Sequence, residues 1–390
     1  MPIVNRFAEM FAEISGWRRA IHQHPELGFD VETTAGFVAG RLAEFGCDEV
    51  VTGIGRTGVV GLIHGRARAS GHVIGLRADM DALPIVEETG KPWASRVAGK
   101  MHACGHDGHT AMLLGAARCL CETRHFDGTV AVIFQPAEES GGGGREMVAD
   151  GLMERFAIQS VYGMHNMPGL PIGHFSIRSG PLMAAADVIT ITVHGKGGHA
   201  AWPHGCIDPV MIGAHIVTAI QSIVARTIDP LDSAVISITT FHAGEADNVI
   251  AERAHLSGTV RTLNPATRAA IETRIRDVVE SVARAHGGSA TLDYRHGYPV
   301  TFNHERQTNF AIDVARSVAG LDRVDADIRP IMGAEDFAYM LEARPGAMIF
   351  LGNGDSAGLH HPAYDFNDEI IPLGCSYWVR LVETAMPLLP

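Results

Sequence analysis

Strand-like and helix-like stretches alternate through the first half of the chain. Short apolar runs occupy residues 71–80, 128–139 and 160–167, and a helix-like stretch at 109–124 lies between the first two. This alternation predicts an α/β fold built on a mostly parallel sheet. Catalytic and ligand-binding groups gather beyond the carboxyl ends of parallel strands, so the polar residues that end each apolar run are the first candidates for a functional site.

A second pattern begins near residue 183. Residues 186–201 alternate apolar and polar positions, a helix-like stretch follows at 208–226, and strand-like runs return at 233–244 and 254–262. Strict alternation is typical of strands with one solvated face, so we expect an α+β satellite domain inserted into the α/β domain. The predicted boundaries are 1–182 for the first part of the α/β domain, 183–296 for the satellite and 297–390 for the second part.

Composition argues against several classes of protein. The 390 residues include 44 acidic and 31 basic side chains, giving a formal net charge of -13, and no basic run that would follow a phosphate backbone, so no nucleic-acid partner is expected. The first thirty residues lack the apolar core of a signal peptide, and no unbroken apolar run reaches the roughly eighteen residues of a membrane span. Six scattered cysteines form no disulfide framework. We therefore expect a cytoplasmic protein with reduced thiols and no membrane partner.

The run MHACGHDGHTAM at 101–112 concentrates potential metal ligands. It places His102, Cys104, His106, Asp107 and His109 within eight positions. A structural zinc module would need a second ligand pair nearby, and the sequence offers none of suitable spacing. A catalytic Cys–His nucleophile stays open, although no third group that would orient the base is identifiable. Loop histidines that only satisfy hydrogen bonds, or one wall of a metalloenzyme site, are the other two interpretations.

Further ligand types follow other strand-like runs. Glu138 and Glu139 end the run at 128–139, His165 stands near the end of 160–167, and His360 and His361 follow a later apolar run. Each is a metal-ligand type at the expected end of a strand. Two adjacent carboxylates also suit catalysis, because one can bind a metal while the other takes a proton from a metal-bound water. The set as a whole favours the metalloenzyme interpretation.

The chain resembles the M20 family of metallopeptidases, in particular its amidohydrolase branch of aminoacylases, hippurate hydrolases and auxin-conjugate hydrolases. The similar motifs keep the family's order and extend over nearly the whole chain, at 17–34, 75–85, 101–117, 132–151, 163–173, 195–210, 248–250, 258–262, 332–340 and 359–368. The resemblance implies a two-domain α/β fold in which the larger domain is catalytic and the inserted satellite serves for dimerisation or as a lid.

The resemblance also implies a metal centre with two divalent ions. Its ligands would be Cys104, His106, Glu139, His165 and His360, with Glu138 as general base and His361 left out. The family favours manganese or zinc, and mixed N, O and S ligation leaves cobalt and nickel open. Where other branches carry a His-x-Asp ligand motif, this chain reads RADMD, so Asp79 and Asp81 are expected to support the ligands rather than to bind metal.

The same resemblance gives roles to three satellite residues. His199 would reach the substrate's developing oxyanion across a dimer interface, and Asn248 or Arg261 would bind the substrate carboxylate. The expected assembly is a homodimer or a higher homo-oligomer formed through the satellite. The expected activity is metal-dependent hydrolysis of the amide bond of N-acyl amino acids, of the hippurate or N-acetyl type. A dipeptidase or aminopeptidase of the same family is the nearer alternative, and a non-catalytic metal-binding protein the more distant one.

Overall fold

The computed structural model describes residues 3–388 and divides into two compact units. The larger unit comprises residues up to Leu182, Phe302–Arg329 and the segment from Asp336 onward, and the smaller unit comprises Met183–Thr301 and Pro330–Glu335. The sequence predicted domain boundaries at 182/183 and 296/297, and in the structure the chain passes between the units at 182/183 and 301/302. Residues 330–335 also belong to the smaller unit. Each unit has its own apolar core.

The larger unit is an α/β layer structure, as predicted from the alternating runs. Its first part contains α1 (Ile3–Gln23), α2 (Glu32–Phe45), β1 (Glu49–Ile54), β2 (Gly58–His64), β3 (Val73–Asp79), α3 (His106–Thr123), β4 (Thr129–Gln135), α4 (Gly143–Ala149), α5 (Leu152–Arg155), β5 (Ser160–Pro168), β6 (Phe175–Ser176) and β7 (Gly180–Met183). The later segments supply β14 (Thr301–Asn303), α8 (Glu305–Ala319), β15 (Val324–Asp325), α9 (Ala338–Ala343), β16 (Gly346–Gly354) and α10 (Ile371–Ala385), with single 3-10 turns at Leu321–Arg323 and Asp368–Ile370.

Eight strands of the larger unit form one sheet in the order β1-β2-β4-β3-β5-β16-β6-β15. The four central strands β4, β3, β5 and β16 are parallel, whereas β1 and β2 are joined to them by antiparallel pairings. The apolar runs expected at 71–80, 128–139 and 160–167 are β3, β4 and β5, and α3 is the expected helix between the first two. Parallel pairing brings the carboxyl ends of these strands to one edge of the sheet, which confirms the predicted fold class.

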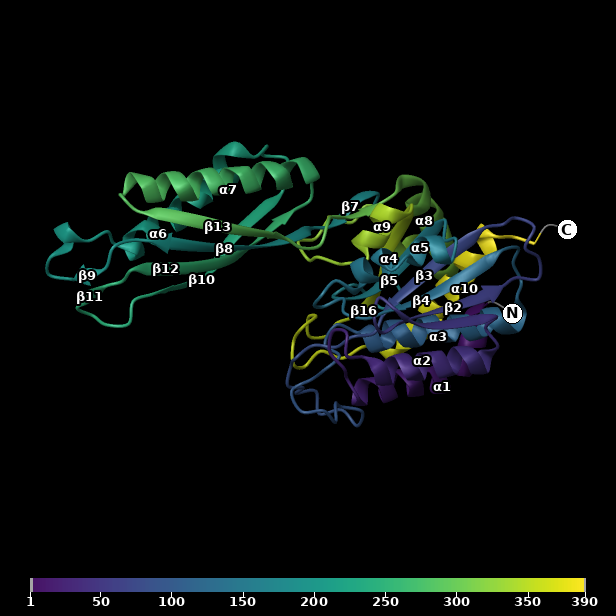
Figure 1. Cartoon of the computed structure of the whole chain (residues 1–390). Coiled ribbons are helices and arrows are strands. Elements are labelled where there is room, and N and C mark those ends of the chain that lie inside the picture. The colour runs from purple at the N-terminus through teal and green to yellow at the C-terminus, as the bar shows by residue number, and fades with distance from the viewer. Residues whose placement is uncertain (1–2, 389–390) are drawn as a thin grey trace. The chain divides into compact units, whose positions relative to one another are not determined.

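Helices cover both faces of this sheet, and the ribbon in Figure 1 shows α1, α2 and α3 together along one side with α4, α5 and α9 on the other. The buried side chains of α3 and α10 join strand residues such as Leu76, Val132 and Ile349 in one continuous core. Fifteen of the eighteen residues of α3 are buried, so this helix runs through the interior of the unit. Its first residue is His106, at the carboxyl edge of the sheet.

The smaller unit is a four-stranded antiparallel sheet packed on two helices. It contains β8 (Ala185–His194), β9 (Gly198–His199), a 3-10 turn at Pro203–Gly205, α6 (Pro209–Thr227), β10 (Ala234–Ala243), β11 (Val249–Ile250), β12 (Arg253–Thr262), α7 (Pro265–Ala285) and β13 (Ser289–His296), and the sheet order is β10-β12-β8-β13. Figure 1 shows α7 lying along β13 and β8. Alternate residues of β8 and β12 are buried, as the sequence alternation predicts for strands with one solvated face.

Helix α6 has strong local reasons to form. Asp208 precedes it and accepts hydrogen bonds from the Val210 and Met211 amides, and Pro209 stands at the first helical position. Isoleucines recur at 212, 216, 220 and 223 and are buried in the core of the smaller unit. The sequence reasoning found no candidate membrane span, yet in residues 3–388 this one helix is long and apolar enough by length and composition to cross a membrane. The four buried isoleucines contribute to that hydropathy.

Candidate metal centre

The ligand-type residues of the larger unit meet at the carboxyl edge of its sheet. Cys104 and His106 stand at the beginning of α3, Glu138 and Glu139 follow β4, and His165 lies near the end of β5. His360 comes from the loop after β16, and its amide donates to the Ala103 carbonyl at 2.8 Å. Segments far apart in the sequence therefore bring sulfur, imidazole and carboxylate donors to one place.

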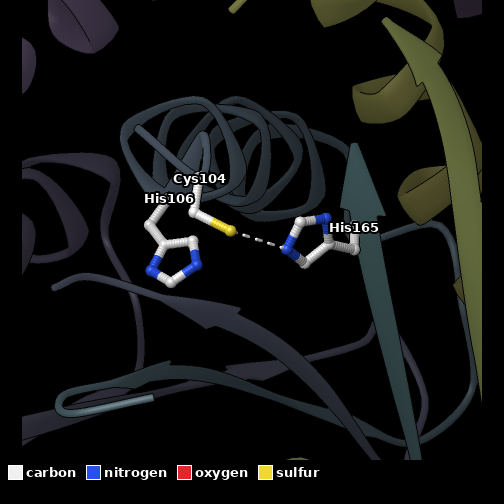
Figure 2. Close-up of side chains that lie close together, drawn as sticks. All are labelled: Cys104, His106 and His165. Carbon is white, nitrogen blue, oxygen red and sulfur yellow. Dashed lines mark hydrogen bonds between the residues drawn. The ribbon is translucent and has the colours of Figure 1, made fainter. Parts of the chain in front are cut away.

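Several overlapping groups of donor atoms have the spacing of metal ligands. Within each group the donor atoms lie within 4.8 Å of one another: Cys104 with His106 and His165, Cys104 with Glu139 and His360, and His106 with Glu138 and Glu139. Figure 2 shows the thiol of Cys104 pointing at the Nε2 atom of His165, 3.4 Å away. The groups share Cys104, His106 and Glu139, as expected where two ions occupy neighbouring positions.

The loop after β16 presents one of its two histidines to this cluster. His360 has a left-handed backbone with φ of 65°, and its Nε2 atom lies 3.2 Å from Oε1 of Glu139. His361 instead accepts a hydrogen bond at Nδ1 from the Ala363 amide, 3.0 Å away. A positive φ is costly for a residue with a Cβ atom, so the local backbone conformation is held by its surroundings and turns His360 toward Glu139.

Asp81 lies between the backbone of Glu138 and Glu139 and the imidazole of His106. Its two carboxylate oxygens accept hydrogen bonds from the Glu138 and Glu139 amides, each at 3.0 Å. One of these oxygens also lies 3.4 Å from Nδ1 of His106. The Nε2 atom of His106 is buried without a hydrogen-bond partner among the described residues, and Asp79, Glu139 and Glu138 oxygens lie 3.7, 3.8 and 4.0 Å away. An imidazole nitrogen aimed into a space lined by carboxylates fits a metal ligand.

His109 also lies within ligand distance of Asp79 and His106, but both of its nitrogens are already used. Nδ1 donates to Asp79 at 2.6 Å, and Nε2 accepts from the Asn166 amide at 3.0 Å. The second oxygen of Asp79 accepts from Arg77 at 2.7 Å. These hydrogen bonds use both nitrogens of His109 and hold the Asp79 carboxylate beside it, an arrangement that suits supports of the donor cluster.

The carboxylates around the cluster favour the binding of a cation. Burial disfavours the charged imidazole of His106, but Asp79, Asp81 and Glu139 outweigh burial and raise the pKa of His106 to about 10. Burial, reinforced by Glu139, Glu138 and Asp79, raises the pKa of Cys104 well above its usual range. Divalent cations would reverse both shifts, because a bound cation favours thiolate and neutral imidazole. Donor set, unpaired nitrogen and local charge together fit a centre for divalent ions.

Three comparisons with known proteins agree with this geometry. Residues 75–384 match the model of peptidase family M20/M25/M40. The chain belongs to the M20 peptidase family. It is 40% identical over 381 residues to the hippurate hydrolase of Campylobacter jejuni, with 98% of each chain covered. It is 39% identical over 365 residues to the N-acetylcysteine deacetylase of Bacillus subtilis, covering 93% of this chain and 94% of that one.

A solved structure extends the likeness to the three-dimensional fold. The YXEP protein of Bacillus subtilis, a dinuclear metal-binding peptidase from the M20 family, matches with a TM-score of 0.85 and 34% identity, over 98% of this chain and all of that chain. The predicted family and enzyme class are thereby confirmed. This M20 protein is a metal-dependent amidohydrolase with two divalent ions.

The satellite residues of this M20 hydrolase do not form one group. His199 on β9 is exposed, and β9 pairs with β11, so Val249 lies opposite His199 and Asn248 lies beside it. Arg261 is half-buried on β12, where it lies opposite Ala186 near the start of β8. Arg253 pairs with His194 at the other end of β8, so the two ends of the strand are eight residues, or about 26 Å, apart. His199 follows the end of β8 that is remote from Arg261.

Sequence reasoning missed a clamp on the first turn of α3. Asn166 donates from its side chain to the Cys104 carbonyl at 2.6 Å, and Tyr364 donates to the Asn166 side-chain oxygen at 2.6 Å. Gly105, between Cys104 and His106, has φ of 89°. A Cβ there would lie 2.3 Å from the side-chain nitrogen of Asn166 and 2.6 Å from the Tyr364 hydroxyl. Only glycine fits this close approach. The motif GMHN contains Asn166, but nothing in its spacing indicates which carbonyl it holds.

A second missed support comes from α1. Asp107, directly after His106, is buried and accepts from His22 Nδ1 at 2.8 Å. Arg18 lies 3.4 Å from the same oxygen, and the other nitrogen of His22 lies 3.3 Å from Glu87. Burial alone would lower the pKa of His22, but Asp107 and Glu87 outweigh it and raise that pKa to about 9. The first helix is thus tied by charge to the turn that carries the metal-type donors.

The ion pair between His22 and Asp107 makes the stability of the M20 hydrolase depend on pH. A histidine whose pKa is raised on folding stabilises the fold fully below its unfolded pKa of about 6.5, and that contribution is lost as the pH rises through the folded value. In His22→Gln the contribution is absent. We expect the free-energy advantage of wild type over His22→Gln to shrink by about 3 kcal/mol between pH 6.5 and pH 9. Urea unfolding followed by tryptophan fluorescence at several pH values measures it.

The exposed His24 offers the matched control. The same measurement on His24→Gln is the control for replacing a histidine near the end of α1. A stability difference between wild type and His22→Gln that does not change with pH would contradict the charged His22–Asp107 pair.

Proposed function

We propose that this M20 amidohydrolase cleaves the amide bond between an acyl group and an amino acid. The observation that carries the proposal is the overlap of donor groups around Cys104, His106 and Glu139, with a second glutamate beside them. The names of two relatives, a hippurate hydrolase and an N-acetylcysteine deacetylase, support N-acyl amino acids as the substrate class. Hippurate-type and N-acetyl-type substrates are the first to test.

The proposed ligands of the two ions are Cys104, His106, Glu139, His165 and His360. Imidazole, thiolate and carboxylate together suit zinc or manganese, and cobalt or nickel could replace them. When bound, such ions polarise the amide carbonyl and make a water molecule a strong nucleophile. Asp81 and His109 then keep the ligands oriented, because Asp81 holds His106 and the glutamate backbone, and His109 holds the backbone of Asn166.

Glu138 is the proposed general base. Its amide is fixed by Asp81 at 3.0 Å, and its Oε1 accepts from the Asp336 amide at 3.4 Å. Its other oxygen lies 4.0 Å from Nε2 of His106, on the edge of the donor cluster. From there Glu138 would take a proton from the attacking water and deliver it to the nitrogen of the leaving amino acid. Glu139, the proposed metal ligand of the two, would stay ionised and bind the ions.

The satellite residues would contact the substrate from two chains. We propose that His199 donates a hydrogen bond to the developing oxyanion in the partner's active site, and that Asn248 or Arg261 binds the substrate carboxylate. The separation of His199 and Arg261 along β8 supports this division, since one satellite cannot offer both side chains to one small substrate. A homodimer is therefore part of the proposal.

The smaller unit has a surface suited to such a dimer. Strand β10 is at the edge of its sheet, where one row of backbone groups pairs with no other strand among the described residues. Phe241 and Val235 on β10 are 38% and 36% exposed, and Val210 and Met211 on α6 are 45% and 44% exposed. Exposed apolar side chains beside an edge strand favour association with a second copy. The six free cysteines support placing this dimer in the cytoplasm.

The general base gives the first test of the mechanism. We expect metal-loaded wild-type enzyme to hydrolyse N-benzoylglycine or N-acetyl amino acids, and Glu138→Gln to lose about 10² to 10⁴ fold in kcat, because the amide cannot accept the water's proton. Metal content should stay nearly intact, since Glu138 is not among the proposed ligands. Product amine release and elemental analysis of the same samples measure both.

Near-normal turnover by Glu138→Gln would contradict the assignment of the base. Dipeptides belong in the same panel of substrates. Preference for dipeptides over N-acyl amino acids would favour the peptidase alternative, and no turnover with any substrate at any of the four metals would favour a protein that only binds metal.

The two adjacent histidines after β16 give a test of the ligand set. His360→Ala should deplete bound metal, because the His360 imidazole is 3.2 Å from Glu139, whereas His361→Ala should retain it, because His361 is engaged with the Ala363 amide. Elemental analysis of dialysed proteins decides between them. Loss of metal from His361→Ala alone would mean that the ligand is the second histidine.

Subunit mixing tests the role of His199. Homodimers of His199→Ala and of Glu138→Gln should each be nearly inactive, because every site lacks one essential group. In a heterodimer of the two variants, one composite site has the intact Glu138 of one subunit and the intact His199 of its partner, and the other site carries both defects. Activity should return toward half of the wild-type value per dimer.

Co-expression with two affinity tags provides verified heterodimers for this measurement. An inactive heterodimer, or a monomer in sedimentation, would rule out donation of His199 to the partner's site. Mixing His199→Ala with itself under the same tags is the control for incomplete inactivation.

A further inference from the structure

Two cysteines of the larger unit lie side by side on the far end of α3. Cys47 follows the end of α2, and Cys121 lies in the last turn of α3, 74 residues later. Their sulfur atoms are 3.5 Å apart, and one thiol donates to the other. In residues 3–388 no other two cysteine sulfurs are this close: Cys104 faces His165, and Cys375 donates to the Met112 carbonyl.

Arg124 holds the two segments in register. This residue ends α3, and its guanidinium donates to the Gly46 carbonyl at 2.8 Å and to the Asp48 carboxylate at 2.7 Å, the residues on either side of Cys47. It also donates to the His64 carbonyl at 2.8 Å. A planar guanidinium with several fixed hydrogen bonds is a stiff tether, so the two sulfurs are kept as neighbours by a contact independent of the thiols.

We propose that Cys47 and Cys121 are a dithiol site that peroxide converts reversibly into an intramolecular disulfide. Cys47 is half-buried and borders solvent, and 7% of Cys121 is exposed, so a small oxidant can approach the pair. The sulfurs would need to move about 1.5 Å closer to reach a disulfide bond length of about 2.0 Å.

The chemistry balances with hydrogen peroxide as oxidant. A thiolate attacks one peroxide oxygen, the O–O bond breaks, and a sulfenic acid and one water form after proton uptake. The second sulfur attacks the sulfenic sulfur, the S–S bond forms, the S–O bond breaks, and the hydroxyl leaves as a second water. The hydrogen bond from Cys47, together with Arg124, lowers the pKa of Cys121 despite burial, so Cys121 is the sulfur that first becomes a thiolate.

The position of the pair predicts what the disulfide does to the enzyme. Cys121 is fifteen residues after His106 on α3, about 22 Å along the helix axis, so the metal-type donors are remote from it. Turnover should therefore be unchanged by the cross-link. Closing a long loop restricts the unfolded chain, and the thermal midpoint of the oxidised form should be higher than that of the reduced form.

Peptide mapping tests the proposal on metal-loaded enzyme, in which the ions shield Cys104. After brief treatment with near-stoichiometric hydrogen peroxide and alkylation of free thiols, tryptic digestion should yield residues 42–56 joined to residues 119–124. Dithiothreitol should separate the two peptides. Recovery of 42–56 and 119–124 only as alkylated or over-oxidised single peptides would overturn the proposal.

Peptide 119–124 contains Cys119 as well, which makes Cys119→Ser the matched control. It should keep the cross-linked peptide, whereas Cys47→Ser and Cys121→Ser should lose it. A cross-link that vanishes in Cys119→Ser and persists in Cys121→Ser would also overturn the assignment. If a serine variant fails to fold, wild-type digestion followed by fragmentation between Cys119 and Cys121 decides the same question. A thermal midpoint that falls on oxidation would contradict the stabilising role.

Discussion

The buried charge of Arg77 organises the end of the sheet on which the site is built. Its guanidinium is 1% exposed and contacts the carboxylates of Asp79 at 2.7 Å and Asp336 at 3.2 Å, together with the side chain of Gln135 at 2.9 Å. A buried cation is costly unless paired, so these contacts fix the ends of β3 and β4 and the segment before α9 relative to one another. Asp79 in turn accepts a hydrogen bond from Nδ1 of His109, and Nε2 of His109 accepts one from the backbone amide of Asn166.

From Asn166 the same chain of contacts reaches the donors. Asn166 holds the Cys104 carbonyl, and its oxygen is held in turn by the Tyr364 hydroxyl. The first turn of α3 is thereby fixed on both sides of Gly105, with the Cys104 thiol directed at His165. Metal affinity depends on such outer contacts, because ligands that are already oriented lose little freedom when an ion binds. These buried polar groups orient one another, whereas the His106 nitrogens have no hydrogen-bond partner among the described residues.

The two units carry different sets of candidate residues. The larger unit contains the metal-type donors and Glu138, whereas the smaller unit contributes exposed His199, neighbouring Asn248 and the distant Arg261. A small antiparallel sheet with one solvated face can offer residues at both of its ends, and the outer edge of β10, which pairs with no other strand among the described residues, can pair with a second copy. In the proposed homodimer, satellite residues of two chains would serve one site.

The sequence alone determined the layer architecture, and it supplied the candidates for the donor set. Apolar runs at 71–80, 128–139 and 160–167 matched β3, β4 and β5, because hydrophobic periodicity is a local property that neighbouring residues define. The parallel sheet rule placed Glu139 and His165 at one edge of the sheet, and the family resemblance added Cys104 and His106 to the proposed donor set. The family and enzyme class followed from motifs in order along the chain.

Tertiary structure decided what depends on contacts between distant segments. Nothing in HDGH distinguishes His106, with a free buried nitrogen, from His109, whose nitrogens are bound by Asp79 and Asn166. The orientation of His360 depends on a left-handed backbone in a loop held by the Ala103 carbonyl. The Cys47–Cys121 contact joins residues 74 positions apart, and His22 meets Asp107 over 85. Side-chain direction is set by packing across the fold, and sequence spacing carries no information about such long-range pairs.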